Sequence, residues 1–265
     1  MPTPDSIFSQ ADAYEAFMGR WSRSLAHLFV GFAGVRDGDA VLDVGSGTGA
    51  LTAAVAAAAP SSRIVGVDPA VPYVELAGER LGNPLVRFEV GDAQRLRFRD
   101  ASFDHTLSLL AFNFIPDARK ALGEMRRVTK PGGTVAVAVW DYGKGMEMLR
   151  VFWDEAVALD PASAAQDERG MTNCRRGDLA ALWREQGLRA VAEEGLVIET
   201  RFRSFDDFWQ PFLGRQGPAG AYVASRSAAE REALRSRLRA RLVGERADGA
   251  LVLRARAWAV RGSAG

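Results

Sequence analysis

The residues best suited to chemistry lie in a glycine-rich segment around residue 45. The segment reads Asp43-Val44-Gly45-Ser46-Gly47-Thr48-Gly49. Glycines at alternating positions allow positive φ angles and let the backbone approach a ligand closely. On its own, a glycine-rich turn between a strand and a helix is shared by binders of nucleotides, flavins and nicotinamides. The charge and the spacing around the turn must therefore decide what it binds.

Charge and spacing argue against a diphosphate ligand. The dinucleotide fingerprint is G-x-G-x-x-G, whereas this chain has G-x-G-x-G with Asp43 two residues before the first glycine. A carboxylate repels a diphosphate, but it suits a ligand that carries an ammonium and a sulfonium group. No Gly-Lys-Ser/Thr follows the turn, which excludes the phosphate loop of NTPases.

Two further carboxylates follow the next two predicted strands. Asp68, followed by Pro69, stands where an acidic side chain can accept both hydroxyls of a ribose, a role that dinucleotide enzymes share. Asp92 stands where it can accept from the exocyclic amine of an adenine, while the amide of Ala93 serves a ring nitrogen. One carboxylate after each of three successive strands predicts a site for a cationic adenosyl ligand.

The elements that position these residues alternate regularly between residues 40 and 140. The pattern predicts strands over 40–44, 63–68, 86–90, 103–109 and 134–140, helices over 51–59, 72–81 and 116–128, and a turn over 131–133. Strands that alternate with helices in this way indicate a parallel sheet covered on both faces. Ligands of such sheets bind beyond the carboxyl ends of the strands, where the three carboxylates are expected.

Beyond residue 140 the pattern predicts a more helical, aromatic-rich region. Helices are expected over 146–159, 178–186, 205–212 and 228–242, strands over 188–198 and 251–260, and a polar connection over 160–177. Asp178 is the expected N-cap of its helix. Most aromatic side chains here should be core, and the remainder can roof an apolar acceptor pocket. They are Phe152, Trp153, Trp183, Phe205, Phe208, Trp209, Phe212 and Tyr222.

Composition indicates an ordinary soluble, cytoplasmic protein. Of the 265 residues 48% are hydrophobic and 25% charged, and the net charge of +1 would not steer the chain to nucleic acid or a membrane. No secretory signal or stretch long enough to span a bilayer is evident. The single cysteine, Cys174, excludes an internal disulfide and is expected to be an inert or substrate-lining thiol.

At these motifs the chain resembles the class I S-adenosylmethionine-dependent methyltransferases, and within them the small-molecule branch (methyltransferase type 11) that includes the quinone-biosynthesis enzymes. The matching segments are 41–49, 66–69, 91–93, 102–104 and 127–133. The resemblance implies a doubly wound α/β fold, with a seven-stranded, mostly parallel sheet whose last strand is antiparallel. It implies one domain over 1–265, made of an N-terminal helical cap (1–36), a cofactor-binding half (37–140), substrate-side helical insertions with strand six (141–250) and a final strand (251–265).

The resemblance also implies the cofactor, S-adenosyl-L-methionine, its product S-adenosyl-L-homocysteine, and the residues that hold it. The backbone near Leu109 and Leu110 should receive the methionine ammonium, and Tyr14 and Arg20 should close over the cofactor, with the arginine at its carboxylate. Arg20 is otherwise a surface arginine. The predicted cofactor-binding residues are Tyr14, Arg20, Asp43, Gly45, Ser46, Gly47, Gly49, Asp68, Pro69, Asp92, Ala93, Leu109 and Leu110.

The chain departs from the family after the fourth strand. A run like Leu-Ala-Leu-His-His in relatives is Leu-Ala-Phe-Asn-Phe here, over 110–114, so no histidine base stands at this position. His105 is expected to be structural and His27 packed or solvated. Asp141 and Asn113 are the remaining catalytic candidates, and Asp141 is equally well explained as a solvated turn residue. The predicted substrate-lining residues are Trp21, Asn113, Phe114, Trp140 and Tyr142.

The function expected from the sequence is methyl transfer to an O, N or C nucleophile of a small, apolar or aromatic acceptor. Alignment and desolvation can supply most of the barrier reduction for this displacement. Two alternatives stay open: a non-catalytic protein that binds the same cofactor or its product, and a nicotinamide oxidoreductase, which the loop spacing and Asp43 disfavour. No metal-ligand cluster, nucleic-acid partner or stable membrane insertion is expected, and a homodimer is left open.

Overall fold

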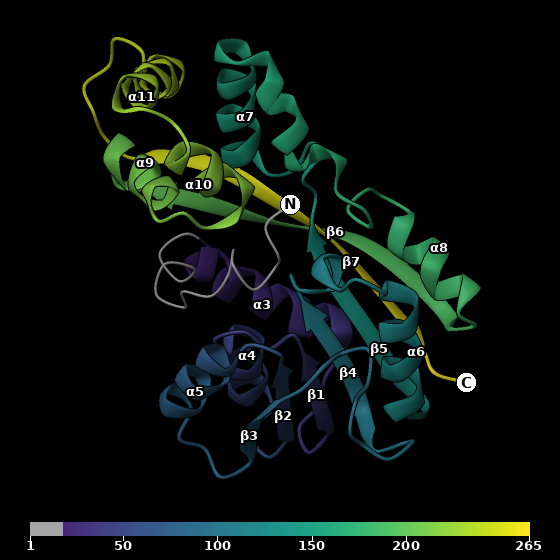
Figure 1. Cartoon of the computed structure of the whole chain (residues 1–265). Helices are drawn as coiled ribbons and strands as arrows, with labels where there is room; N and C mark the ends of the chain where they lie inside the picture. Colours follow the sequence, from purple (N-terminus) through teal and green to yellow (C-terminus); the bar gives the residue numbers. More distant parts are fainter. Residues whose placement is uncertain (1–17) are drawn as a thin grey trace.

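A seven-stranded sheet forms the centre of the molecule, in the order β3-β2-β1-β4-β5-β7-β6 (Figure 1). A computed structural model describes residues 18–265. The strands are β1 (Ala40–Val44), β2 (Arg63–Asp68), β3 (Val86–Val90), β4 (Phe103–Leu109), β5 (Thr129–Trp140), β6 (Arg189–Phe202) and β7 (Leu251–Ser263). β1 to β5 pair in parallel, and β7 is antiparallel to both β5 and β6. The predicted fold class, with its antiparallel last strand, is confirmed.

The order of the strands creates the ligand crevice. The chain begins at the middle of the sheet, winds outward to β3, and then crosses to β4 on the other side of β1. Side chains at the carboxyl ends of β1 and β4 therefore face an open space where the winding direction switches. Every residue of β1 is buried, as expected for a parallel strand with helices on both faces.

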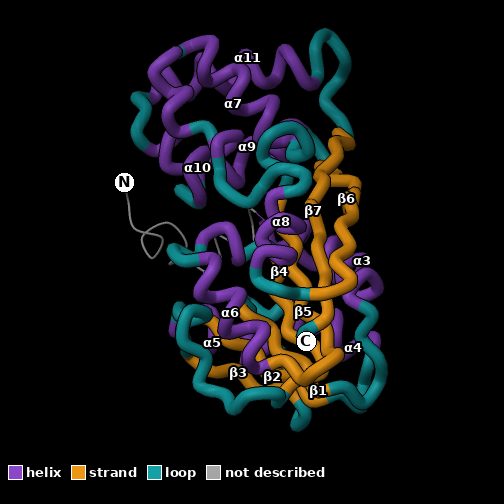
Figure 2. The backbone as a smooth tube through the Cα atoms, turned by 90° about the vertical axis from the view of Figure 1, so that its right-hand side faces the viewer, coloured by secondary structure: helices purple, strands orange, loops and turns teal. Residues whose placement is uncertain are grey.

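Helices cover both faces of the sheet. They are α3 (Arg20–Ala33), α4 (Ala50–Ala58), α5 (Val71–Arg80), α6 (Ala118–Val128) and α8 (Asp178–Glu185). Figure 2 shows α3 and α4 on one face and α6 and α8 on the other. The first turn of α6 is capped by Asp117, whose carboxylate accepts from the amide of Lys120.

A second helical layer lies beyond the carboxyl edge of the sheet. Its members are α7 (Glu147–Leu159), α9 (Phe205–Leu213), α10 (Gly217–Ala224) and α11 (Ala228–Leu242). They gather around the far ends of the long strands β6 and β7 (Figure 1). Buried aromatic rings hold the layer together: Phe152 stacks on Phe212 with centroids 4.6 Å apart, and Trp153 lies 5.6 Å from Tyr222. The layer thus has its own core, above the site.

Several predicted boundaries were wrong. The expected turn over 131–133 lies within β5, because the register between β4 and β5 shifts there and accommodates the extra residues. Asp178 is not the N-cap of α8: Gly177 holds that position, and the Asp178 carboxylate accepts from the amide of Arg175. β6 continues to Phe202, and α10 had no predicted counterpart.

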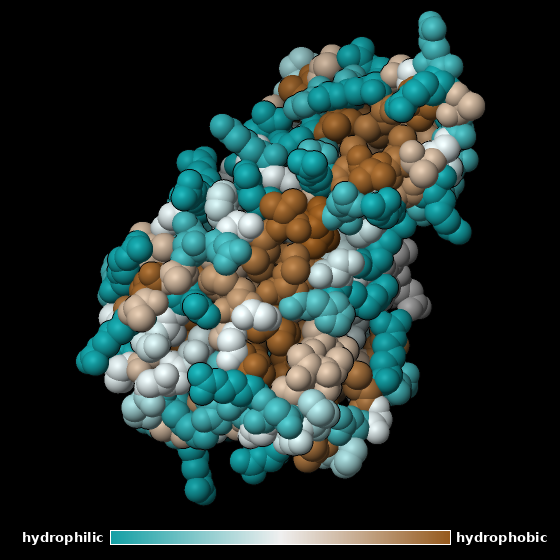
Figure 3. Space-filling view, turned by 180° about the vertical axis from the view of Figure 1, so that it is seen from behind, coloured by the Kyte–Doolittle hydropathy of each residue, from teal (hydrophilic) through white to brown (hydrophobic). Residues whose placement is uncertain are grey.

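The rear of the molecule carries a band of hydrophobic residues between hydrophilic margins (Figure 3). Within residues 18–265, no helix is both long enough and apolar enough to cross a membrane.

Candidate functional site

The glycine-rich turn forms a pocket with the first helix of the sheet layer. We call it the glycine-turn pocket. It is lined by Ser22, Asp43, Gly45, Ser46, Gly47, Thr48, Ala50, Leu51 and Leu109. The pocket therefore joins the ends of β1 and β4 to the start of α4 and to α3, at the predicted switch in winding direction.

The turn is fixed against the end of β2. The amides of Gly45 and Ser46 donate to the carbonyl of Val67 over 2.7 and 3.0 Å. Gly45 has a φ of +75°, and a Cβ there would lie 2.4 Å from the Cβ of Ala111. Gly47 also has a positive φ, +51°, but a Cβ there would meet nothing within 4 Å. The backbone at Gly47 thus borders free space, as a ligand-binding turn requires.

Asp43 is a buried carboxyl with one free oxygen. Its side chain accepts a 2.7 Å hydrogen bond from the hydroxyl of Thr52, while Oδ1 has no partner within the described chain. Burial raises the pKa of Asp43 to about 7, and the nearby charge of Asp68 adds to this rise. The hydroxyls of Ser46 and Ser108 are likewise buried without partners in the described structure. Buried polar atoms normally have partners, so these three atoms suit a polar, cationic ligand.

The other two predicted carboxylates differ in burial. Asp68 is buried, and its two oxygens accept from the amides of Gly47 and Ala70, each over 2.9 Å. It therefore holds the turn, and the second lone pair of each oxygen is available to a ligand. Burial raises the pKa of Asp68. Asp92 is exposed and accepts from the amide of Gln94 over 2.8 Å. Beside them lie exposed Pro69 and half-buried Ala93.

A strained leucine separates the glycine-turn pocket from a second pocket. Leu110 has a φ of +61°, and its amide donates to the carbonyl of Ala138 over 2.8 Å. Leu109 lines the glycine-turn pocket, and Leu110 lines the second one. A bulky residue in the left-handed region is costly, and such strain gathers at functional sites. Ser22, in the first turn of α3, lines the glycine-turn pocket, and Met18, just before α3, lines the second one.

The second pocket, which we call the acceptor pocket, is largely apolar. It is lined by Met18, Leu110, Phe114, Trp140, Tyr142, Leu149, Glu168, Met171, Gly217 and Pro218. Three of the predicted substrate-lining residues meet here. Asn113 lies at its border, since its amide nitrogen is 3.5 Å from the sulfur of Met171.

Trp21 and the later aromatic residues lie elsewhere. Trp21 packs edge-on against Phe202, with ring centroids 5.3 Å apart. Of the eight aromatic residues expected to supply the core or the roof after residue 140, all are buried and none lines the acceptor pocket. The aromatic part of this pocket comes instead from the segments that follow β4 and β5.

Two charged candidates are engaged in ion pairs. Arg20 donates to both carboxylate oxygens of Asp207 over 3.2 Å, and its guanidinium lies 4.3 Å from the ring centroid of Trp21. Asp141 is buried, with one oxygen bound by the guanidinium of Arg256 and the other by the amide of Lys144. Asp141 is thus not a solvated turn residue. Tyr14 lies outside the described residues.

The two histidines and the cysteine lie outside the two pockets. The Nε2 atom of His105 lies 2.9 Å from Asp39, at the opposite end of β4 from the crevice, and burial lowers the pKa of this histidine. Cys174 is buried, which raises the pKa of its thiol to about 12 and leaves it unreactive. His27 is exposed on α3. Among residues 18–265 no three His, Cys, Asp or Glu side chains are grouped to hold a metal ion.

Glu168 is the site residue that the sequence did not reveal. It lies in the polar connection after α7, yet it is buried and lines the acceptor pocket. No periodicity marks it, since its neighbours Asp167 and Arg169 are also charged. Only the packing of the connection beneath α7 brings its carboxyl inward.

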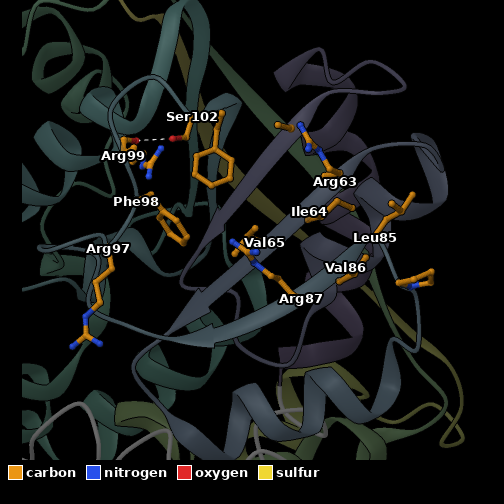
Figure 4. Close-up of a pocket in the computed structure, with 13 residues that line it drawn as sticks. Arg63, Ile64, Val65, Leu85, Val86, Arg87, Arg97, Phe98, Arg99 and Ser102 are labelled. Carbon is orange, nitrogen blue, oxygen red and sulfur yellow. Dashed lines mark hydrogen bonds between the residues drawn. The ribbon is translucent and has the colours of Figure 1, made fainter.

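A further cavity lies away from this site. It measures about 490 Å³ and borders the starts of β1 and β2 at Ala40 and Arg63. Figure 4 shows its rim, with Arg87, Arg97 and Arg99 around an apolar floor. The carboxyl ends of these strands lie roughly 15 Å further along, at 3.3 Å per residue. This cavity is therefore separate from the glycine-turn and acceptor pockets.

Comparisons with known proteins identify a methyltransferase domain within the chain. Residues 42–137 match the model of a methyltransferase domain. An uncharacterized protein of Mycobacterium tuberculosis is 29% identical over 200 residues, 73% of this chain and 70% of that protein. The demethylmenaquinone methyltransferase of Deinococcus radiodurans is 39% identical over 99 residues, which are 37% of this chain and 41% of the enzyme.

The fold extends further than the sequence match. The aligned parts span from 36% to 70% of the lengths of the first curated relatives. A Haloferax volcanii chain, solved in complex with the methyltransferase activator Trm112, superposes with a TM-score of 0.61 at 24% identity. That alignment covers 100% of this chain and 99% of the archaeal one. The chain thus shares its overall fold with that archaeal chain.

Proposed function

We propose that this chain is a class I S-adenosylmethionine-dependent methyltransferase that methylates a small, apolar or aromatic acceptor at an O, N or C nucleophile. The match of residues 42–137 to a methyltransferase domain and the partial similarity to a demethylmenaquinone methyltransferase support this proposal. When bound, S-adenosylmethionine supplies an electrophilic methyl group on a sulfonium. The residues of this chain would bind the donor, align the acceptor and exclude water, which can supply most of the rate enhancement.

The observation that carries the proposal is the pair of adjoining pockets. A polar pocket with unpaired buried oxygens, lined by Leu109, adjoins an apolar, aromatic pocket lined by the strained residue Leu110. A cationic donor in the first pocket and an apolar acceptor in the second would meet at this junction. In-line displacement requires such an approach of the two reactants.

The residues of the glycine-turn pocket fit the donor. In our proposal the free Oδ1 of Asp43 faces the cationic part, and the backbone carbonyls near Leu109 and Leu110 accept from its ammonium. Asp68 and Asp92, which are outside the lining of this pocket, serve the ribose and the adenine. α4 has no side-chain cap, so its first amides can bind the donor carboxylate at the positive end of the helix.

Calorimetry with S-adenosylmethionine, S-adenosylhomocysteine and NAD tests this assignment. We expect the first two to bind and NAD to give no heat. Asp68→Ala should weaken binding of both adenosyl ligands by about 1–3 kcal/mol, because charge-assisted hydrogen bonds to the ribose are lost. An exposed carboxylate on α5, Glu75, offers the control Glu75→Gln. Binding of NAD alone would refute the proposal, and unchanged affinity in Asp68→Ala would remove Asp68 from the ribose.

A further inference from the structure

Glu168 is the single carboxyl side chain among the described residues that line the acceptor pocket. Only 6% of this residue is exposed. Its other neighbours in the lining are apolar or aromatic, apart from the phenol of Tyr142. An isolated carboxyl in such a pocket is costly unless it has a partner or a function.

The polar groups around Glu168 come from α7 and from the connection that carries it. The indole nitrogen of Trp153 donates a hydrogen bond to its Oε2. Arg150 faces it as well, but this arginine is bound by Asp167 through two contacts of 2.6 and 3.1 Å. Burial raises the pKa of Glu168 to about 7, while the Trp153 bond and the Arg150 charge lower it and the Asp167 charge raises it. Near neutral pH this carboxyl can therefore both accept and release a proton.

We propose that Glu168 is the general base of this enzyme, and that the acceptor is a small aromatic alcohol whose phenolic proton it takes. This inference rests on the methyl transfer proposed above. The acceptor oxygen forms a bond to the methyl carbon, the carbon–sulfur bond breaks with its electron pair staying on sulfur, and the O–H proton moves to Glu168. One positive charge on sulfur and one negative charge on Glu168 disappear together, so no net charge develops in the buried site.

The surroundings favour a phenol over an amine. A buried carboxylate would hold an amine as an ammonium ion pair, and an ammonium has no lone pair with which to attack the methyl group. A phenol instead donates a hydrogen bond to Glu168 and keeps a lone pair on its oxygen. Phe114, Trp140 and Tyr142 offer aromatic surfaces to its ring.

The ionisation of the acceptor separates a base from a structural residue. We would measure formation of S-adenosylhomocysteine at about pH 8 with 4-methoxyphenol and hydroquinone, which stay protonated, and with 4-nitrophenol and pentafluorophenol, which are already ionised. Glu168→Gln keeps an oxygen that can accept from Trp153. We expect this variant to slow the methylation of the protonated phenols roughly 100- to 10,000-fold, and that of the ionised phenols by a few-fold at most. Glu75→Gln serves as the matched control.

A second measurement needs neither turnover nor a variant. In protein labelled with ¹³C at the glutamate carboxyls, infrared spectroscopy should reveal a glutamic acid band that titrates near pH 7. Binding of 4-methoxyphenol should change this band. The ¹³C label separates it from Asp43, which is also expected to titrate near this pH.

The possible outcomes divide clearly. The role of Glu168 would be overturned if Glu168→Gln lost methylation rate equally for protonated and ionised phenols, or for neither. It would also be overturned if no glutamic acid band titrated between about pH 6 and 8. If the wild-type protein binds S-adenosylmethionine but methylates none of the phenols, the inferred acceptor is wrong while the proposed methyltransferase function stands. Failure to bind S-adenosylmethionine would refute both.

Discussion

At the scale of single residues, the site depends on carboxyls that the fold keeps in unfavourable places. Asp43 is buried with one oxygen unpaired, and burial raises its pKa to about 7. An acid with a raised pKa holds its proton more tightly in the folded chain than in the unfolded one. The free energy of unfolding therefore falls as the pH rises from about 4 to 7, and it stays lowered above pH 7. In our proposal, binding of a cationic ligand offsets this cost.

Asp43→Asn should accordingly stabilise the ligand-free protein and impair binding. The amide keeps an oxygen for the hydroxyl of Thr52 but cannot ionise. We expect the free energy of unfolding at pH 8 to rise by about 1–3 kcal/mol, with a much smaller change at pH 4. Urea denaturation at the two pH values measures this difference, and calorimetry should reveal weaker binding of S-adenosylmethionine.

The hydroxyl of Thr52 provides the control for this prediction. Thr52→Val removes the hydrogen bond that lowers the pKa of Asp43, so it should destabilise the protein at pH 8. A loss of stability in Asp43→Asn at both pH values would mean that the carboxylate is needed for folding itself.

At the scale of elements, the turn after β1 is locked against the segment after β4. Gly45 combines a positive φ with a close approach to Ala111, so a methyl group there meets both a strained backbone and a steric clash. Gly45→Ala should lower the free energy of unfolding by about 2–4 kcal/mol, combining left-handed strain with overpacking. Thermal or urea unfolding measures this loss.

A double variant separates the two contributions. Ala111→Gly removes the atom that would lie 2.4 Å from the new methyl group, so Gly45→Ala should cost less in that background. Gly47 also has a positive φ, but a Cβ there would meet no atom within 4 Å. Gly47→Ala should therefore lose stability through backbone strain alone. If Gly45→Ala lowered the free energy of unfolding equally in the wild type and in the Ala111→Gly background, the contact with Ala111 would be irrelevant.

The elements also explain what could be predicted from the sequence. The bounds of β1, β2, β3 and β4 match the prediction because each strand is a short run bounded by turn residues, largely buried in β1, β2 and β4 and half-exposed in β3 at the edge of the sheet. α11 matches because its capping box at Ser227 and Glu230 is a local signal. β6 was predicted too short, since its last residues are ordered by pairing with β7, which lies about 50 residues away in sequence.

The acceptor side of the site could not be predicted for the same physical reason. Glu168 has charged neighbours and no periodic pattern, and its burial follows from the packing of Trp153 above it. Asp141 stood in a plausible position after β5, but its partner Arg256 comes from the last strand. Such pairings are set by tertiary contacts that a local pattern does not contain. The candidate residues for the methyl donor could be predicted from the sequence because they lie in one turn and at three strand ends.

At the scale of the whole molecule, one ion pair ties the first described helix to the second helical layer. Arg20, on α3, binds Asp207, on α9, although 187 residues separate them. The guanidinium is also enclosed by the rings of Trp21 and Phe202, at 4.3 and 4.8 Å from their centroids. Both side chains are largely shielded, with 28% and 15% of their surfaces exposed. This ion pair therefore ties α3, which covers one face of the sheet, to α9 in the second helical layer.

We therefore expect Arg20→Lys to lower the free energy of unfolding by more than it weakens the binding of S-adenosylmethionine. Lysine cannot bond both the carboxylate and the backbone carbonyl of Asp207 through one planar group, nor stack on the two rings as a guanidinium does. We therefore expect a loss of about 1 kcal/mol in the free energy of unfolding, after allowance for partial exposure. Asp207→Asn should cost a similar amount, and the double variant should cost less than the sum of the two.

Calorimetry then decides whether Arg20 also contacts the donor carboxylate. If Arg20→Lys weakens binding of S-adenosylmethionine tenfold while Asp207→Asn strengthens it, Arg20 serves the cofactor and Asp207 competes for it. If both variants bind S-adenosylmethionine as the wild type does, the ion pair holds the cap to the helical layer and nothing more.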